Sequence, residues 1–259
     1  MWFEKLSHIQ SDKTDHILFC FPYAGGSAEV FRSLSNCLAK NILVYALQLP
    51  GCGSRFDEAL SRDVENILQA VHEEMKRLIN GKQFSLFGHS NGGLFAYELA
   101  NRLNNENQSP ANVFISAEAA PHITSFKEDP FNLSDTQLSE LLVRYGGTHD
   151  EIISDEDLKA VFFPVIRNDF SINYHMKRYL LPKQSVSELV LIYGRQDKTM
   201  SKEDILAWEN YTCGGIDIHF VDSDHFFIRH IPKVVANIIH ARIELSTKRE
   251  RTAVLSAKV

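Results

Sequence analysis

The strongest constraint on the fold is one short segment in which an apolar run ends in the pattern glycine–x–serine–x–glycine. Residues 84–87 are Phe-Ser-Leu-Phe, and Gly88, Ser90 and Gly92 follow at the required spacing. Apolar residues then recur at helical spacing as far as Leu103. This order predicts a strand, a tight turn that carries the serine, and a helix. Glycines are needed on both sides because a side chain there collides where the chain folds back on itself.

The turn makes Ser90 the candidate nucleophile. A serine at such a turn projects outward over the edge of the sheet, and the first N–H groups of the following helix face any oxygen beside it. A bare glycine–x–serine–x–glycine is common by chance, so the strand before it and the helix after it support the interpretation. Because a serine alone is a weak nucleophile, a base and an acid that orients the base are also required.

Candidates for the acid and the base each follow directly after a predicted strand. Residues 189–193 are strongly apolar and lead to Asp197, whereas residues 216–221 alternate apolar and polar and lead to His225. The carboxyl ends of parallel strands gather functional loops at one edge of a sheet. We therefore predict that Asp197 is the acid and His225 the base.

Rival side chains fit these two roles less well. Asp222 and Asp224 lie too near His225 in sequence to orient its ring through the far nitrogen, and we expect them to cap the next helix. The elbow should point His89 away from the substrate side. The remaining candidate histidines are expected to be packing or surface residues: His219, His230 and His240.

The loop after an early strand is the candidate second half of an oxyanion hole. Residues 17–21 are apolar and precede the loop 22–27, Pro-Tyr-Ala-Gly-Gly-Ser, whose glycines allow close approach of the backbone to a substrate. We expect the N–H groups of Ala24 and Asn91 to bind the oxyanion. Taken alone, the loop could equally be an ordinary strand-to-helix turn.

Along the whole chain, predicted strands and helices alternate as they do in an α/β fold. Helical patterns, such as residues 63–78, alternate with strand candidates, and right-handed crossovers make the strands mostly parallel. The predicted fold class is an α/β-hydrolase fold with helices flanking a central sheet. Its strands are expected at residues 16–21, 42–47, 84–87, 112–116, 189–193 and 216–221.

The interval between the fourth and fifth of these strands is too long for a structureless loop. It contains helix candidates at residues 133–142 and 155–166, and we predict an inserted helical lid. The predicted division is a hydrolase core at residues 1–120 and 184–245, the lid at residues 121–183, and a disordered tail at residues 246–259.

A substrate pocket is expected where the lid meets the loop after the first strand. Tyr23, Phe163 and Phe170 are its candidate lining residues, with the lid aromatics limiting the length of an acyl chain. The alternative is that the aromatic residues of the lid only hold it to the core.

Composition excludes several other classes of protein. The chain has 259 residues, 44% of them hydrophobic, which suits one α/β domain. A net charge of −6 argues against a nucleic-acid partner, and four scattered cysteines predict neither disulfides nor a metal site. No apolar run approaches the roughly 18 residues of a membrane span, and no signal sequence is evident. We therefore expect a cytoplasmic protein.

Several motifs, spread over most of residues 16–232, resemble those of the type II (external editing) thioesterases of nonribosomal peptide and polyketide synthesis. That family lies within the α/β-hydrolases. Taken one at a time, only the serine turn is a strong signal. Taken together, the order and spacing of the motifs are specific for the family. The motifs are residues 21–27 with Phe31, 49–55, 88–92, 167–170 with Tyr174, 194–197, and 224–227.

Three positions depart from the family pattern. Asn91 stands where methionine is common, which leaves the backbone N–H in place. Glu118 stands where arginine is common, which reverses a charge near the lid entrance and leaves the preferred acyl group open. Ser223 replaces a frequent glycine, which we expect to be harmless.

The resemblance implies hydrolysis of short acyl thioesters from the phosphopantetheine arm of a carrier protein, which frees mis-primed or stalled carriers. It implies no cofactor of the enzyme itself, an acyl-loaded carrier protein as partner, and a monomer. A chain-releasing acyl thioesterase and a small-ester carboxylesterase of the same fold are the alternatives. A non-catalytic interaction module is a further alternative, but it does not need the serine, the acid and the histidine together.

Overall fold

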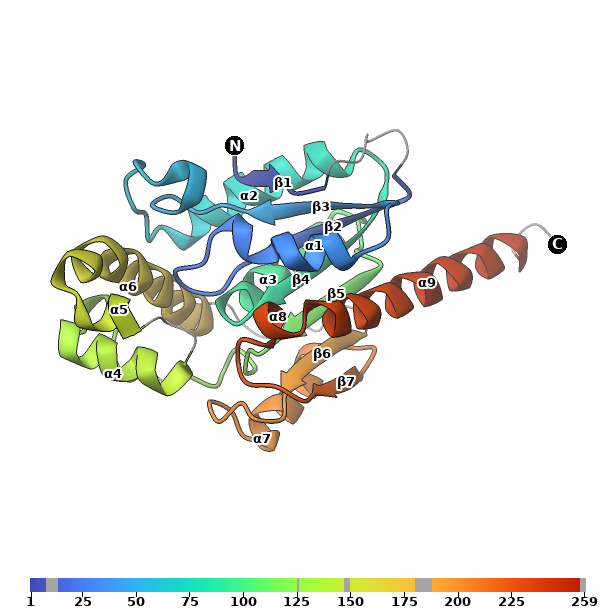
Figure 1. Ribbon diagram of the computed structural model, residues 1–259. Coiled ribbons are helices and arrows are strands. Elements are labelled where there is room, and N and C mark those ends of the chain that lie inside the picture. The colour runs from blue at the N-terminus through green and yellow to red at the C-terminus, as the bar shows by residue number, and fades with distance from the viewer. Residues whose placement is uncertain (8–13, 125, 147–149, 180–187, 257–259) are drawn as a thin grey trace.

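A seven-stranded sheet forms the centre of the molecule (Figure 1). The computed structural model describes residues 1–7, 14–124, 126–146, 150–179 and 188–256. Strand order is β1-β3-β2-β4-β5-β6-β7, and every pairing except that of β1 with β3 is parallel. The strands are β1 (Phe3–Lys5), β2 (His16–Phe21), β3 (Ile42–Leu47), β4 (Gln83–His89), β5 (Asn112–Ser116), β6 (Leu189–Gly194) and β7 (Ile216–Val221).

The six predicted strands are confirmed, and their parallel order agrees with the predicted fold class. The antiparallel strand β1 was not predicted. It has only three residues, which is too short for an alternating pattern to be recognised. β1 covers one edge of the sheet, so that β3 is paired on both sides.

Helices cover both faces of the sheet and enclose a separate apolar core on each. On one face, α2 and α3 pack against Phe19, Phe21 and Leu86. On the other face, α1, α8 and α9 pack against Leu18, Cys20 and Phe87. Alternate side chains of β2 therefore enter opposite cores, because successive side chains of a strand point to opposite faces of the sheet. The helices are α1 (Arg32–Cys37), α2 (Val64–Ile79), α3 (Asn91–Asn105), α7 (Lys202–Leu206), α8 (Phe227–His230) and α9 (Pro232–Ser256), with short 3₁₀ helices at Ala28–Phe31, Gly53–Arg55, Pro130–Asn132 and Ala207–Tyr211.

Three helices between β5 and β6 lie together at one end of the sheet (Figure 1). They are α4 (Asp135–Tyr145), α5 (Asp150–Ser154) and α6 (Glu156–Tyr179). Ser134 caps α4 in a reciprocal capping box with Gln137. The helix predicted at residues 155–166 continues to Tyr179 and includes Pro164. Residues 180–183 of the predicted lid lie outside the described part of the chain.

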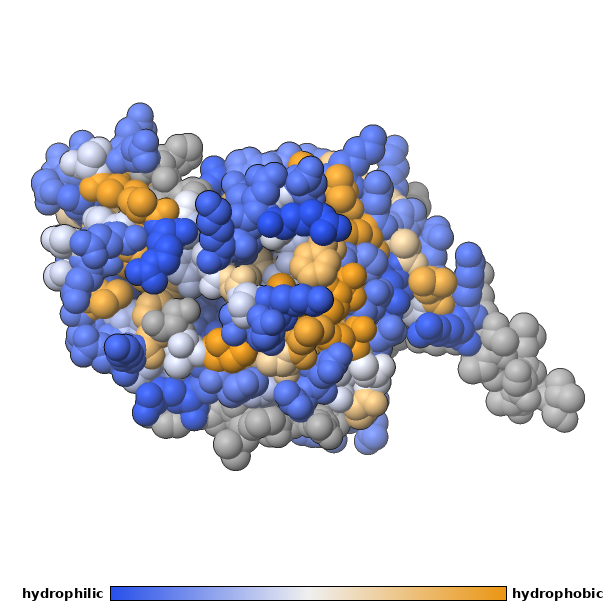
Figure 2. All heavy atoms as spheres, turned by 90° about the horizontal axis from the view of Figure 1, so that it is seen from below, coloured by the Kyte–Doolittle hydropathy of each residue, from blue (hydrophilic) through white to orange (hydrophobic). Residues whose placement is uncertain are grey.

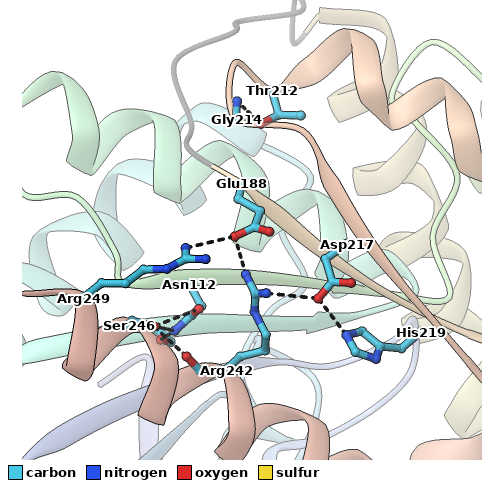
Figure 3. Close-up of polar contacts among 10 residues, drawn as sticks. Asn112, Glu188, Thr212, Gly214, Asp217, His219, Arg242, Ser246 and Arg249 are labelled. Atoms are coloured by element: carbon cyan, nitrogen blue, oxygen red, sulfur yellow. Dashed lines mark hydrogen bonds and ion pairs between the residues drawn. The ribbon is translucent and has the colours of Figure 1, made fainter.

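A polar network fixes α9 to the other end of the sheet (Figure 3). Arg242 pairs with Glu188 and with Asp217, the latter at 3.1 Å between Nη1 and Oδ2. One turn further along, Ser246 Oγ accepts a hydrogen bond of 2.8 Å from the side chain of Asn112. These contacts hold α9 against the sheet at the point along the helix where its apolar face ends.

The predicted disorder of residues 246–259 is wrong as far as Ser256, because α9 continues to that residue. The prediction rests on the loss of apolar periodicity from Ser246 onward. The segment nevertheless consists largely of Lys, Arg, Glu, Ala and Leu, which favour helix without burial. Residues 257–259 lie outside the described part of the chain.

The face of the molecule seen in Figure 2 is largely hydrophilic. Figure 2 shows apolar side chains in patches among polar ones, with a hollow at the side where the lid lies. Of the helices in the described ranges, none has both the length and the apolar character that a membrane crossing requires.

Candidate active site

Ser90 occupies the tight turn between β4 and α3. Its backbone has φ 51° and ψ −125°, an unusual conformation for a residue other than glycine. The Ser90 N–H donates to the carbonyl of Ser116 at 2.7 Å, and the Ser90 carbonyl accepts from Gly93 N–H at 2.7 Å. Strand, turn and helix are therefore those of a nucleophile elbow.

The two glycines of the motif are required by close backbone contacts. A Cβ on Gly88 would lie 2.0 Å from the carbonyl oxygen of Gly92, and a Cβ on Gly92 would lie 1.9 Å from that of Phe21. Neither contact can be relieved by rotation of a side chain, because both partners are backbone atoms. The glycines thus allow α3 to start directly against the end of β2.

Asp197 and His225 meet beyond the ends of β6 and β7. Asp197 Oδ2 lies 2.7 Å from His225 Nδ1, and the side chains of both residues are only 3% exposed. The other oxygen, Asp197 Oδ1, accepts hydrogen bonds from the N–H and the hydroxyl of Thr199 at 2.9 and 2.6 Å. The carboxylate is therefore fixed on both sides. Thr199, which lies two residues after the acid, was not predicted as a site residue.

The environment keeps Asp197 ionised. Burial by itself would raise the pKa of its carboxyl group, but the hydrogen bonds and the charge of His225, with those from Thr199, lower that pKa below its ordinary value. An ionised carboxylate on Nδ1 keeps a proton on that nitrogen and leaves Nε2 free to accept one.

Ser90 and His225 line the same two cavities. One, the inner chamber, has a volume of about 60 Å³ and is also lined by Asn91 and Glu118. The other, the outer groove, has a volume of about 160 Å³ and is lined by Tyr23, Ala24 and Arg229 among others. The predicted nucleophile, base and oxyanion donors thus gather around one location in space.

The carboxyl group of Asp169, on α6, supports the predicted oxyanion loop. Asp169 Oδ2 accepts a hydrogen bond from Gly25 N–H at 2.8 Å, and its backbone carbonyl accepts one from Asn91 Nδ2 at 3.1 Å. Asp169 is 1% exposed. Burial raises the pKa of Asp169 to about 7, although the Gly25 N–H and the Asn168 amide act in the opposite direction. In the sequence, Asp169 stands out only as part of a family motif.

Asp169→Asn should change how stability depends on pH. The folded-state pKa of about 7 lies above the ordinary value of 3.8, so between these values the folded protein holds a proton that the unfolded chain has lost. Wild-type stability relative to Asp169→Asn should therefore fall as pH rises through this window and level off above pH 7. We expect a change on the order of 2 kcal/mol between pH 5 and pH 8.5, measured by urea denaturation of both proteins. A difference that does not vary with pH would contradict the assigned pKa.

The rival side chains have other partners, although the ring of His89 packs against that of His225 with 5.7 Å between their centroids. His89 is fully buried, with Nδ1 2.8 Å from Ser116 Oγ, and burial holds its pKa well below the ordinary value. Asp224 accepts from Phe226 N–H at 2.9 Å, just before α8. The other candidates pair with carboxylates or amides at partly or fully exposed positions: Asp222, His219, His230 and His240.

One predicted pocket residue is placed differently. Tyr23 lines the outer groove, and Phe170 lines both cavities. Phe163 is 1% exposed and packs with Leu138 and other residues inside the lid, so it is not among the lining residues of either cavity. Its neighbour Phe162 lines the outer groove instead. Successive helical residues point about 100° apart, and the sequence alone does not say which of two adjacent phenylalanines faces inward.

The mostly parallel sheet, the serine turn and the buried acid–histidine pair are features of the α/β-hydrolase class of enzymes. The chain matches the Thioesterase domain model over residues 16–243 and belongs to that family. It is therefore a thioester hydrolase.

Relatives support this assignment. The chain is 32% identical to the gramicidin S biosynthesis protein GrsT of Aneurinibacillus migulanus over 214 residues, 82% of each chain. It is 30% identical over 236 residues, 89% of each chain, to the medium-chain S-acyl fatty acid synthase thioesterase of Rattus norvegicus. The solved structure of BorB, a type II thioesterase of the borrelidin cluster, matches with a TM-score of 0.78 and 25% identity over 93% of this chain and 97% of that one.

Proposed function

We propose that this enzyme removes short acyl groups from the phosphopantetheine arm of carrier proteins, as an editing thioesterase of nonribosomal peptide or polyketide synthesis. The observation that carries the proposal is the position of Ser90 between a small inner chamber and a larger outer groove. The likeness to GrsT and to the type II thioesterase BorB supports the same conclusion.

The outer groove suits a long, narrow arm. It shares Tyr23, Gly25, Phe162 and Ile166 with a further cavity of about 230 Å³ that runs between α6 and the loops 23–30 and 51–56. The exposed Phe56 and the partly exposed Phe162 lie along this path. A pantetheine arm can extend through the two cavities while the folded carrier stays outside.

The inner chamber favours short acyl groups. Its volume of about 60 Å³ is well below the roughly 300–1,000 Å³ of common ligand pockets. The likeness to the rat medium-chain enzyme raises release of longer chains as the alternative. The size of the chamber favours editing.

The proposed reaction uses the groups at the junction of the two cavities. His225 takes the Ser90 proton as Ser90 Oγ attacks the thioester carbonyl, and Asp197 stabilises the imidazolium. The N–H groups of Ala24 and Asn91 bind the oxyanion. The thiol leaves with the proton from His225, and a water activated by His225 then releases the acid from Ser90.

Deacylation of a loaded carrier tests this function. A carrier protein bearing acyl groups of two to twelve carbons is mixed with the enzyme, and loss of the acyl group is followed by intact-protein mass spectrometry. Rates should be highest for two to four carbons and fall as the chain lengthens. A preference for eight carbons or more would favour chain release, and hydrolysis of free esters alone would favour a carboxylesterase.

Phe170→Ala and Phe163→Ala form a matched pair for testing which lid aromatic limits chain length. Phe170 lines both cavities, so its removal should join them and raise the relative rate for six to eight carbons about tenfold, at roughly 1 kcal/mol per methylene accommodated. Phe163→Ala should lower stability by about 3 kcal/mol and leave the chain-length profile unchanged, because Phe163 lies in the lid core. The same profile in folded Phe170→Ala would contradict the assignment of the chamber.

A further inference from the structure

The lid helix α6 contacts the loop that carries Ala24, one of the two proposed oxyanion donors. Asp169 Oδ2 accepts from the N–H of the next residue, Gly25, at 2.8 Å. One turn earlier in α6, Ile166 packs on the same loop so closely that a Cβ on Gly25 would lie 2.7 Å from Ile166 Cγ1. Both contacts come from the lid, whereas the loop follows β2 of the core. The position of the loop therefore depends on where α6 lies.

Two hydrogen bonds fix the direction of Ala24 N–H. Gly26 N–H donates to the Tyr23 carbonyl at 2.9 Å. The peptide bond between Tyr23 and Ala24 is trans and planar, so Ala24 N–H points away from that carbonyl. The next peptide unit, between Ala24 and Gly25, is held by the carboxyl group of Asp169. Loss of the bond to Asp169 would free this second unit and leave Ala24 N–H fixed from one side only.

The same residue of α6 also binds the residue that carries the second donor. Asn91, whose backbone N–H is the other proposed donor, donates from Nδ2 to the backbone carbonyl of Asp169 at 3.1 Å. Because this bond is made by the backbone of Asp169, substitution of the Asp169 side chain leaves it in place. A change of side chain at Asp169 therefore tests the loop half of the oxyanion hole alone.

A carboxyl group at this position lowers stability. Asp169 is 1% exposed, and among the described residues no lysine or arginine pairs with it. The other contact of its side chain is with the neutral amide of Asn168, which lies 3.5 Å from Oδ1. A buried carboxyl group without a cationic partner costs free energy, which an apolar side chain would avoid. An apolar side chain would, however, leave Gly25 N–H without this acceptor. The carboxyl group therefore holds the loop at a cost in stability.

We propose that Asp169 is a positioning residue that couples the lid to the oxyanion hole. The carboxyl group on α6 holds the loop so that Ala24 N–H faces the oxygen of the tetrahedral intermediate. The lid then does more than enclose the substrate, because the oxyanion hole is complete only when α6 lies against the loop. This inference rests on the proposed function, in which Ala24 and Asn91 donate to the oxyanion.

Asp169→Leu and Asp169→Asn form a matched pair for testing the acceptor. Both keep the branched shape of the side chain, but only Asp169→Asn keeps an oxygen that can accept from Gly25 N–H. In Asp169→Leu we expect kcat for propionyl-pantetheine to fall about a hundredfold with KM changed less than about threefold, because the reaction loses an oxyanion donor. Asp169→Asn should keep kcat within about fivefold of the wild-type value, because the hydrogen bond is retained. Asp169→Ala also lacks the acceptor and takes the place of Asp169→Leu if that protein does not fold.

A trifluoromethyl ketone separates an effect on the oxyanion hole from a general disturbance of the site. In S-trifluoroacetonyl pantetheine, Ser90 adds to the ketone carbon, and the oxygen of the resulting hemiketal occupies the oxyanion hole. The affinity for this ketone should therefore fall by the same factor as kcat/KM in each Asp169 variant.

Arg62→Ala is the control for loosening of the lid. Arg62 Nη1, on the core, lies 3.7 Å from Asp129 Oδ2, on the lid, and neither residue is among those that line the inner chamber or the outer groove. The variant removes a contact between lid and core without touching the oxyanion loop. It should change kcat and the affinity for the ketone less than about threefold.

The outcomes separate this inference from the function on which it rests. Wild-type kcat in folded Asp169→Leu, an equal loss in Asp169→Asn, or a lower kcat with unchanged affinity for the ketone would overturn the role of Asp169 and leave the thioesterase function intact. A loss in Arg62→Ala as large as that in Asp169→Leu would do the same, because the effect would then belong to the lid as a whole. Failure of the wild-type enzyme to hydrolyse propionyl-pantetheine would overturn both.

Discussion

Ser90→Ala is expected to abolish turnover while leaving the fold intact. Removal of a triad nucleophile costs roughly 10⁴–10⁶ in rate, because the acyl-serine intermediate no longer forms. The Ser90 contacts that hold the turn are made by its backbone N–H and carbonyl, so loss of the hydroxyl should change stability by less than about 1 kcal/mol. Single-turnover deacylation of a loaded carrier measures the loss of rate, and thermal unfolding checks the fold.

An alkyl fluorophosphonate provides the matching control. It should label Ser90 in the wild-type enzyme and no residue in Ser90→Ala, as peptide mapping would show. A folded Ser90→Ala protein that keeps a tenth of the wild-type rate would rule out the covalent mechanism.

Asp197→Asn is expected to lower kcat by roughly 10²–10⁴. The asparagine oxygen should turn toward the two donors of Thr199, which places its NH₂ group against His225 Nδ1. Nδ1 must then accept, so the ring carries its proton on Nε2 and cannot take the proton of Ser90. The pH–rate profile and kcat for carrier deacylation measure the effect.

Asp222→Asn and Asp224→Asn are the controls for the choice of acid. Asp224 bonds a backbone N–H beside α8, and Asp222 lies on the surface near Gln196, so each change should alter kcat less than threefold. A larger loss in either control than in Asp197→Asn would mean that the acid has been misassigned.

Local patterns were sufficient to predict most of the fold. The strand before Asp197 is almost entirely apolar, the strand before His225 alternates apolar and polar residues, and the strand before Ser90 leads into the serine motif. Each strand ends in a functional loop at the same edge of the sheet. Backbone geometry then brings residues more than a hundred positions apart into one site. That is why the acid and the base could be predicted by their position after strands.

Contacts between distant segments could not be predicted in the same way. Nothing local indicates that Asp169 on α6 accepts from Gly25, or that Lys177 pairs with Glu118. The rotation of α6 about its own axis decides which of its side chains enter the lid core. The sequence therefore did not show that Phe163 lies in that core and Phe162 lines the outer groove. In each case the deciding contact is between elements whose relative placement is set only by tertiary packing.

Trapping of the acyl-enzyme tests the central claim most directly. The enzyme is mixed with a carrier protein bearing an isotope-labelled propionyl group, quenched within milliseconds in acid, digested, and mapped by mass spectrometry. We predict that the labelled propionyl group is found on Ser90, with one free carrier thiol formed for each acyl group transferred, and that Ser90→Ala carries no label. Label on another residue, or thiol release by Ser90→Ala at the wild-type rate, would contradict the assignment of Ser90 as the nucleophile of a thioesterase.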